Sequence, residues 1–226
     1  MIIRIPALLS ADRLAAIRTR LEAAAWEDGR ATAGHQSAQV KSNMQLPQHD
    51  PVTHEIGEEI VRALEHSALF VSATLPRHVY PPLFNRYESG MTFGAHIDNA
   101  VRQIPGTSHR LRTDLSATLF LTSPEEYDGG ELLIEDTYGP QSIKLAAGDL
   151  VVYPSSSIHR VLPVTRGTRT AAFFWIQSMV RDDGARALLH ELDTSIRELA
   201  RDGARNDALV RLTACYHNLL RRWADL

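Results

Sequence analysis

The chain has 226 residues, of which 44% are hydrophobic and 23% charged, and its formal net charge is −3. This composition is typical of a globular protein with one core, and the slight acidity excludes a global attraction to nucleic acid or to an anionic membrane. The single cysteine, Cys215, excludes a disulfide within the chain. We find no signal peptide and no apolar run near the roughly 18 residues of a membrane span. We therefore expect a cytoplasmic protein.

The first 77 residues are expected to contain two helices and short strands. Residues 2–5 predict a strand, Ser10 is typical of an N-cap, and Asp50–Pro51 begins a second helix. Between the helices, residues 39–46 alternate polar and apolar side chains, so a strand there has one wholly polar face. That face either borders water at a sheet edge or lines a pocket, and the sequence leaves both interpretations open. The polar positions are Gln39, Lys41, Asn43 and Gln45.

Residues 78–180 have the pattern of a β domain, because short β-rich runs alternate with turns that carry glycine or proline. Such spacing predicts a sandwich, a jelly roll or a barrel. The runs are 83–88, 92–98, 115–122, 131–137, 141–146, 149–154, 158–164 and 169–180. We therefore predict a mainly β core with flanking helices, an α+β protein.

Residues 181–226 return to helical periodicity in two apolar stripes separated by Asp202–Gly203. They predict a helical hairpin, which must cover either the outside of the β domain or a second subunit. The expected organisation is thus an N-terminal region at 1–77, a β core at 78–180 and a helical extension at 181–226, with a homodimer through the last helices as one arrangement.

The stretch FGAHIDN places His96 and Asp98 two residues apart, so both side chains lie on one face of a strand. An imidazole and a carboxylate are a common pair of ligands for a divalent metal. His159, which begins another β-rich run, is the best third ligand. Two histidines and one carboxylate on one face of an octahedron are the arrangement of non-haem Fe(II) oxygenases.

Many such enzymes use 2-oxoglutarate, whose distal carboxylate needs a cation, and arginine is suited to bidentate binding. Arg169 lies ten residues after His159. If residues 165–167 form a three-residue hairpin loop, Arg169 lies opposite Pro163, on the same face as His159. A two-residue loop would turn Arg169 to the other face.

The combined pattern resembles the Fe(II)/2-oxoglutarate oxygenases of the prolyl/lysyl hydroxylase type, and most closely the bacterial PKHD-type hydroxylases. It consists of HID at 96–98, His159, Arg169, NRYESG upstream and DGGEL between them, and the likeness extends to KSNMQL at 41–46 and the C-terminal helices. The resemblance implies a double-stranded β-helix (jelly roll).

It also implies that His96, Asp98 and His159 bind iron and that Arg169 anchors 2-oxoglutarate. Tyr87 matches a tyrosine of the pattern and is expected either to contact the cosubstrate or to be a core aromatic. Phe120 departs from the pattern, because some prolyl hydroxylases have a tyrosine there, and Thr118 or Tyr153 would have to replace its contact.

The implied activity is hydroxylation of an amino-acid or peptidyl substrate, with release of succinate and CO2 and a link to bacterial iron uptake. The cofactors are Fe(II), 2-oxoglutarate and O2, with L-ascorbate as reductant. Two alternatives stay open: a cupin-like metal enzyme without 2-oxoglutarate, and a non-enzymatic metal-dependent binding module.

Residues 99–113 follow Asp98 directly and carry Arg102, His109, Arg110 and Arg112. We expect either a solvated loop or a mobile lid at the site entrance, whose positive charge favours an anionic substrate. Seven histidines are expected to be ordinary surface or core residues: His35, His49, His54, His66, His78, His190 and His217.

Overall fold

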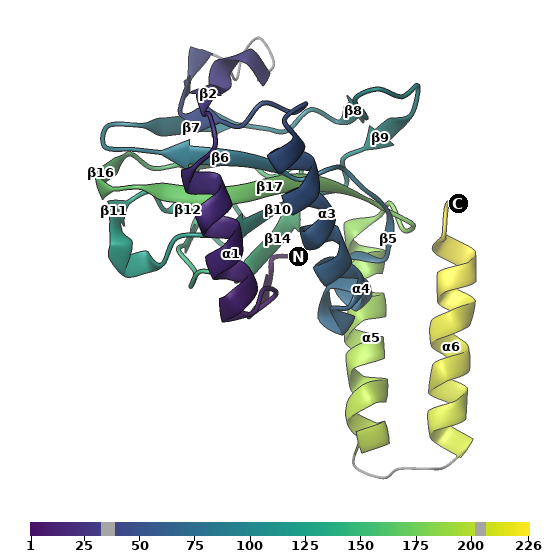
Figure 1. Cartoon of the computed structure of the whole chain (residues 1–226). Coiled ribbons are helices and arrows are strands. Elements are labelled where there is room, and N and C mark those ends of the chain that lie inside the picture. Colours follow the sequence, from purple (N-terminus) through teal and green to yellow (C-terminus); the bar gives the residue numbers. More distant parts are fainter. Residues whose placement is uncertain (33–38, 202–206) are drawn as a thin grey trace.

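The computed structural model describes residues 1–32, 39–201 and 207–226. Its framework is a pair of antiparallel sheets with helices on one side (Figure 1). The large sheet has the order β1-β14-β10-β17-β6-β4-β2, and β5 also pairs with β17. Its strands are β1 (Ile3–Ile5), β2 (Glu27–Asp28), β4 (Met44–Gln45), β5 (Pro76–Val79), β6 (Leu83–Tyr87), β10 (Leu115–Phe120), β14 (Leu150–Pro154) and β17 (Arg169–Ser178).

The small sheet has the order β13-β12-β15-β7-β3. Its strands are β3 (Lys41–Ser42), β7 (Thr92–His96), β12 (Leu132–Ile134), β13 (Gln141–Ile143) and β15 (His159–Val161). Two further pairs lie outside both sheets: β8 (Val101–Gln103) with β9 (Arg110–Arg112), and β11 (Tyr127–Gly129) with β16 (Val164–Gly167).

Alternation along the central strands separates two environments. In β10, Leu115, Ala117 and Leu119 pack in the core beneath the helices, whereas Ser116 and Thr118 line a pocket on the opposite face. Every second side chain of a strand points to the same face, so one strand can serve a core and a site at once. In β10 the apolar side chains thus belong to the core under the helices, and the two polar side chains lie on the pocket side.

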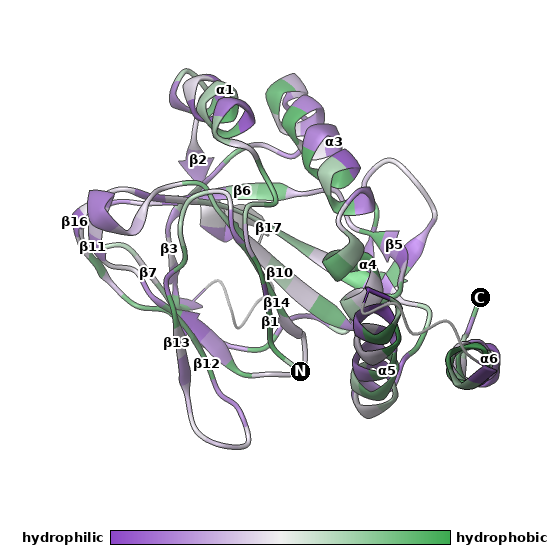
Figure 2. Cartoon of the chain, turned by 90° about the horizontal axis from the view of Figure 1, so that it is seen from below, coloured by the Kyte–Doolittle hydropathy of each residue, from purple (hydrophilic) through white to green (hydrophobic). Residues whose placement is uncertain are grey.

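Helices α1 (Ala11–Glu22) and α3 (Pro51–Glu65) lie across the outer face of the large sheet (Figure 2). The side chains of Ser10 and Asp50 accept hydrogen bonds from backbone N–H groups of the first turns, which confirms both predicted N-caps. A third helix, α4 (Ala68–Thr74), was not expected from the sequence. Its buried Phe70 extends the same core.

The second core lies between the two sheets and contains residues of both. Val151 and Tyr153 of the large sheet join Leu132, Ile134 and Val161 of the small sheet. This cluster closes one side of the space between the sheets, and the pocket described below occupies the remainder.

The segment with the polar face passes from one sheet to the other. Lys41 pairs with Phe93 of β7, whereas Gln45 pairs with Asn85 of β6. Lys41, Asn43 and Gln45 are all at least nine-tenths buried, so the water-facing interpretation of this face is wrong at these positions. Both Lys41 and Asn43 line the pocket.

The C-terminal residues form the predicted helical hairpin, α5 (Asp183–Arg201) and α6 (Asp207–Trp223), which projects beside the sheets (Figures 1 and 2). Leu189 packs with Leu75 and Val180, while α6 has no buried residue. The Asp202–Gly203 interruption lies outside the described residues. None of the described helices has the length and apolarity that a bilayer crossing would need.

Candidate active site

A pocket of about 810 Å³, counted to its open mouth, lies between the two sheets. The large sheet contributes Asn85, Tyr87, Ser116, Thr118 and Arg169 to its lining. The small sheet and its adjoining loops contribute Lys41, Phe93, His96, Asp98 and His159. Polar and ionisable groups from segments far apart in the chain therefore converge in one enclosed place.

His96 and His159 are direct cross-strand partners in β7 and β15. Their ring centroids lie 4.3 Å apart. His96 Nδ1 lies 2.8 Å from the carbonyl oxygen of Gly94, and His159 Nδ1 lies 3.0 Å from that of Ser157. A carbonyl oxygen can only accept, so each Nδ1 carries the proton and each Nε2 presents its lone pair.

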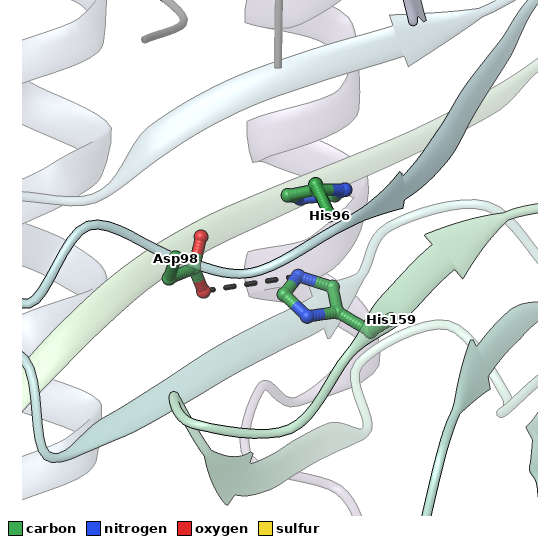
Figure 3. A group of neighbouring side chains, drawn as sticks. All are labelled: His96, Asp98 and His159. Atoms are coloured by element: carbon green, nitrogen blue, oxygen red, sulfur yellow. Dashed lines mark ion pairs between the residues drawn. The ribbon is translucent and has the colours of Figure 1, made fainter. Parts of the chain in front are cut away.

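Asp98 lies two residues after the end of β7 and turns its carboxylate towards the imidazoles (Figure 3). Its Oδ2 lies 3.7 Å from His159 Nε2 and accepts a hydrogen bond of 2.5 Å from Ser116 Oγ. Ser116 Oγ in turn lies 2.7 Å from Ser155 Oγ. The two hydroxyls orient the carboxylate in the way that outer groups orient metal ligands.

One ligand atom from each of His96, Asp98 and His159 lies within 4.8 Å of the other two, the only such group of three among the described residues. Burial, with a smaller contribution from His159, lowers the pKa of His96 to about 4. This imidazole is therefore neutral at physiological pH, as a metal ligand must be. Two imidazoles and a carboxylate form a suitable donor set for Fe(II), with further coordination positions left for other ligands.

Arg169 is 1% exposed and lies at the start of β17, opposite Tyr87 of β6. Its guanidinium carbon lies 5.3 Å from the ring centroids of both Tyr87 and Phe120. Its Nε and Nη1 are buried without a hydrogen-bond partner in the described structure, and no acidic side chain there forms an ion pair with it. A buried, unpaired charge costs several kcal/mol, so this site fits an anionic ligand such as a carboxylate.

The predicted register of Arg169 is wrong, although the residue lies in the expected pocket. No hairpin joins residues 158–164 to β17, because β16 pairs with β11 and the chain enters the large sheet at Arg169. Gly167 has φ +73°, and a Cβ there would lie 2.1 Å from the carbonyl oxygen of Glu126. This close approach holds β16 against β11 and directs Arg169 to β6 and β10.

Tyr127 is a neighbour of Arg169 that sequence reasoning missed. Its hydroxyl is buried, and like that of Tyr87 it has no partner in the described part of the chain. Gly130 shows that Tyr127 and Arg169 are neighbours, because a Cβ there would lie 3.1 Å from both Tyr127 Cε2 and Arg169 Cδ. The available signal was that DGGEL follows Tyr127 directly, so the glycines and the tyrosine belong to one turn.

The two residues proposed to replace the missing tyrosine at 120 both line the pocket. Thr118 is on β10, and Tyr153 lies against His159 with 5.1 Å between ring centroids. Burial raises the pKa of the Tyr153 phenol, which therefore stays protonated. Phe120 itself packs against Arg169 and offers no hydrogen bond.

Within residues 99–113, β8 and β9 form a short hairpin (Figure 1). Asn99 and Arg102 of this segment line the pocket. Leu111 is buried, and the guanidinium of Arg102 stacks 3.9 Å from the ring centroid of Trp175. The base of the segment is thus anchored to the large sheet. Of the other histidines, His190 is buried with its Nδ1 2.9 Å from Ser72 Oγ, as expected for a satisfied core residue, and His35 lies outside the described residues.

Comparison with known proteins defines the class. A model described as the 2OG-Fe(II) oxygenase superfamily matches residues 82–177. A prolyl-4-hydroxylase of Pseudomonas putida superimposes with a TM-score of 0.54 at 20% identity, over 78% of this chain and 92% of its own. A prolyl hydroxylase of Trichoplax adhaerens, solved with a peptide fragment, superimposes with a TM-score of 0.55 at 13% identity, over 83% and 86%. These two similarities are similarities of fold. The chain is a 2-oxoglutarate- and Fe(II)-dependent oxygenase, an oxidoreductase.

A second model, described as the PKHD-type hydroxylase C-terminal domain, matches residues 183–225. A PKHD-type hydroxylase of Xanthomonas campestris is 58% identical over 228 residues, covering all of both chains. The chain therefore belongs to the PKHD-type hydroxylase family, which confirms the resemblance seen in the sequence. Membership also decides against the non-enzymatic binding module and the enzyme without 2-oxoglutarate.

Proposed function

We propose that His96, Asp98 and His159 bind the Fe(II) and that Arg169 anchors the distal carboxylate of 2-oxoglutarate. One observation carries this assignment: a fully buried, unpaired guanidinium lines the same pocket as a cluster of two imidazoles and a carboxylate. An oxygenase of this class needs both a metal and an anionic cosubstrate, and the pocket offers one place for each.

The phenol groups of Tyr87 and Tyr127 complete the cosubstrate site in this proposal. Both hydroxyls are buried near Arg169 and have no partner in the described structure. A hydroxyl buried in that way costs free energy unless a ligand accepts its hydrogen bond. In this proposal Tyr127, rather than Thr118 or Tyr153, donates the hydrogen bond to the distal carboxylate that Phe120 cannot make.

When bound, Fe(II) with 2-oxoglutarate and O2 supplies the oxidising chemistry that hydroxylates a substrate C–H bond and releases succinate and CO2. The chain contributes positioning. The carbonyl oxygens of Gly94 and Ser157 hold the two imidazoles with Nε2 inward, and Ser116 holds the carboxylate of Asp98. Apolar walls, including Phe93 and Val161, exclude water from the cluster.

The sheet pair supports the finer description of the fold as a double-stranded β-helix, with the site between its sheets. The division into 1–77, 78–180 and 181–226 is part of the same proposal. The ranges matched by the two family models, 82–177 and 183–225, are compatible with it.

For the substrate we propose an amino acid or a peptide. The Trichoplax relative was solved with a peptide fragment, which supports this class by fold alone. A role in bacterial iron uptake, L-ascorbate as reductant and a cytoplasmic location stay predictions from the sequence. Self-association through the C-terminal helices is also a prediction, supported by the exposed apolar side chains of Leu188, Leu199 and Val210.

The test is to load the purified protein with Fe(II) and 2-oxoglutarate without oxygen and to record the metal-to-ligand charge-transfer band, then to admit O2 and measure succinate. We expect the band and iron-dependent succinate formation in the natural protein. Asp98→Ala should lose both while remaining folded, and Arg169→Ala should keep iron binding but require far more 2-oxoglutarate. A natural protein that binds iron without ever showing the band would contradict the assignment.

A further inference from the structure

Two cationic side chains other than Arg169, those of Lys41 and Arg102, line the pocket. Arg102 stacks on Trp175, which lies six residues beyond Arg169 on the same face of β17. At ~3.3 Å per residue the two positions are about 20 Å apart along the strand. Arg102 is thus at the end of the pocket opposite the proposed 2-oxoglutarate anchor, and its role has to be a different one.

Lys41 lies beside the proposed metal site. It is 6% exposed, its Nζ donates to Gln45 Oε1 at 3.0 Å, and it lies 5.5 Å from the Phe93 ring centroid. Phe93 in turn stacks on His96 with 3.6 Å between ring centroids. Burial, followed by repulsion from Arg102, lowers the pKa of Lys41 to about 8. Lys41 and Arg102 therefore act on each other electrostatically and line the same pocket.

The described lining carries little negative charge. Asp98 is the one acidic side chain there, and it belongs to the proposed metal site. Asp28 also attracts the charge of Lys41, and it forms an ion pair with Arg30. The formal charges of Fe(II), Asp98, 2-oxoglutarate and Arg169 cancel. Lys41 and Arg102 add two further cationic groups to the pocket lining.

The surroundings of the two cations offer hydrogen bonds and apolar walls. The side chain of Asn43 is buried with neither its Nδ2 nor its Oδ1 paired in the described structure, and the same holds for Asn85 Oδ1. Arg102 Nε is also buried without a described partner. Leu83, Phe173 and Trp175 line the pocket beside them. Such a mixture suits a ligand with one charged and one apolar part.

We propose that Lys41 and Arg102 bind a carboxylate of the substrate, and that Leu83, Phe173 and Trp175 hold the apolar part attached to it. The substrate class is therefore a carboxylate-bearing amino acid or peptide rather than a neutral or cationic one. This inference rests on the proposed function, since it assigns the remainder of the same pocket.

The test uses probe pairs of equal size that differ in charge. N-acetyl-L-leucine and N-acetyl-L-leucinamide compare a main-chain carboxylate with its amide. N-acetyl-L-glutamic acid α-amide and N-acetyl-L-glutamine α-amide do the same for a side-chain carboxylate. Binding to the anaerobic protein loaded with Fe(II) and 2-oxoglutarate is measured by calorimetry and by the change in tryptophan fluorescence, to which Trp175 contributes. Inorganic phosphate is tested as a further anion.

We expect at least one acid to bind about 10-fold or more tightly than its amide, the usual effect of a charged hydrogen bond. The pair that discriminates identifies the carboxylate source. Lys41→Met and Arg102→Met should each remove most of the discrimination, and Arg102→Lys should keep part of it. Arg110→Met, which removes an exposed charge from the same hairpin, is the matched control and should change nothing.

Equal binding of acids and amides would overturn the inference, and so would the failure of every carboxylate to bind at millimolar concentration. Phosphate binding more tightly than any carboxylate, or unchanged discrimination in folded Lys41→Met and Arg102→Met proteins, would overturn it as well. The charge-transfer band of the natural protein is read in the same samples. A normal band without acid discrimination refutes the carboxylate site alone, whereas an absent band refutes the proposed function.

Discussion

Ser116 acts on the proposed metal site through Asp98, whose carboxylate accepts its 2.5 Å hydrogen bond. Without that hydroxyl the carboxylate can rotate away from the two imidazoles. We expect Ser116→Ala to weaken Fe(II) binding by about 10-fold with little change in folding, as for other groups that orient metal ligands.

The measurement is an anaerobic Fe(II) titration, with Mn(II) as an oxygen-stable check. Ser156→Ala removes an exposed hydroxyl from the loop before His159 and is the matched control. If the two variants bind the metal equally well, Ser116 has no positioning role.

The hydroxyl of Tyr127 is assigned to the distal carboxylate of 2-oxoglutarate. Its loss should raise the KM for 2-oxoglutarate about 3- to 10-fold, the value of one hydrogen bond, while iron affinity stays constant. The midpoint temperature of thermal unfolding should be no lower in the ligand-free Tyr127→Phe protein than in the natural protein. The reason is that the hydroxyl makes no hydrogen bond in the described structure. Tyr138→Phe, at a side chain 93% exposed, is the control. A purely structural role for the phenol would instead lower stability and leave KM unchanged.

The buried ammonium group of Lys41 should lower the free energy of unfolding at neutral pH. Its pKa falls from 10.5 to about 8 on folding, mainly because of burial. Below about pH 8 both the folded and the unfolded state are protonated, and the native state carries the full cost of the buried charge. Between about pH 8 and pH 10.5 the unfolded state binds more protons, so stability rises with pH as this cost is removed.

Lys41→Met should therefore raise the free energy of unfolding by about 1–2 kcal/mol at neutral pH. This is less than the roughly 3 kcal/mol of the full pKa change, because the hydrogen bond from Lys41 Nζ to Gln45 Oε1 is lost. This difference in the free energy of unfolding between the variant and the natural protein should vanish near pH 10.5. Urea unfolding of the two proteins at neutral and at alkaline pH measures the difference at each pH. A variant that is less stable than the natural protein at neutral pH would show that the buried charge is compensated in the ligand-free fold.

At the scale of elements, the C-terminal hairpin is attached through one face of α5. Leu189 is fully buried against Leu75 and Val180, whereas its neighbour Leu188 is 54% exposed. Leu189→Ala should lower the free energy of unfolding by about 2–4 kcal/mol, and Leu188→Ala by less than about 0.5 kcal/mol. Urea unfolding followed by circular dichroism compares the two. Similar effects would mean that the helix does not dock as described.

The surroundings of the polar segment 39–46 also depend on other secondary-structure elements. Its alternation predicts one polar face for any strand, since the period of two is a local property. What lies opposite that face depends on β6 and β7, which are 40 and more residues further along the chain. Lys41 and Asn43 could therefore be recognised as sharing a face, but not as pocket residues.

At the scale of the whole molecule, the helical extension should control association. Removing residues 181–226 uncovers Leu75 and Val180, which are 3% and 1% exposed in the full chain. We expect the truncated protein to aggregate or to lose dimerisation, because apolar surface is exposed to water. Sedimentation velocity over a range of concentrations tests both results. A truncated protein that stays monomeric and soluble, with the full chain also a monomer, would contradict the prediction.

The sequence by itself determined the family, the order of the elements and the candidate ligands. N-caps, turns and the spacing of His96 and Asp98 are local features, so they can be read from neighbouring residues. His159 is a candidate because it begins a β-rich run, and Arg169 because a cation is needed and this one lies ten residues later; the family resemblance then supports both. Tyr127 and Ser116 carried no comparable signal, since their importance comes from what they approach in space.

Only the tertiary structure decided the pairing of the strands. The expected hairpin before Arg169 was a reasonable local solution, but β16 pairs with β11 through the close approach at Gly167. Likewise, the packing of the sheets brings Lys41 and Arg102 of the β8–β9 hairpin to the same pocket. Strand pairing and packing depend on contacts between residues distant in the chain, and a single sequence contains no local record of such contacts.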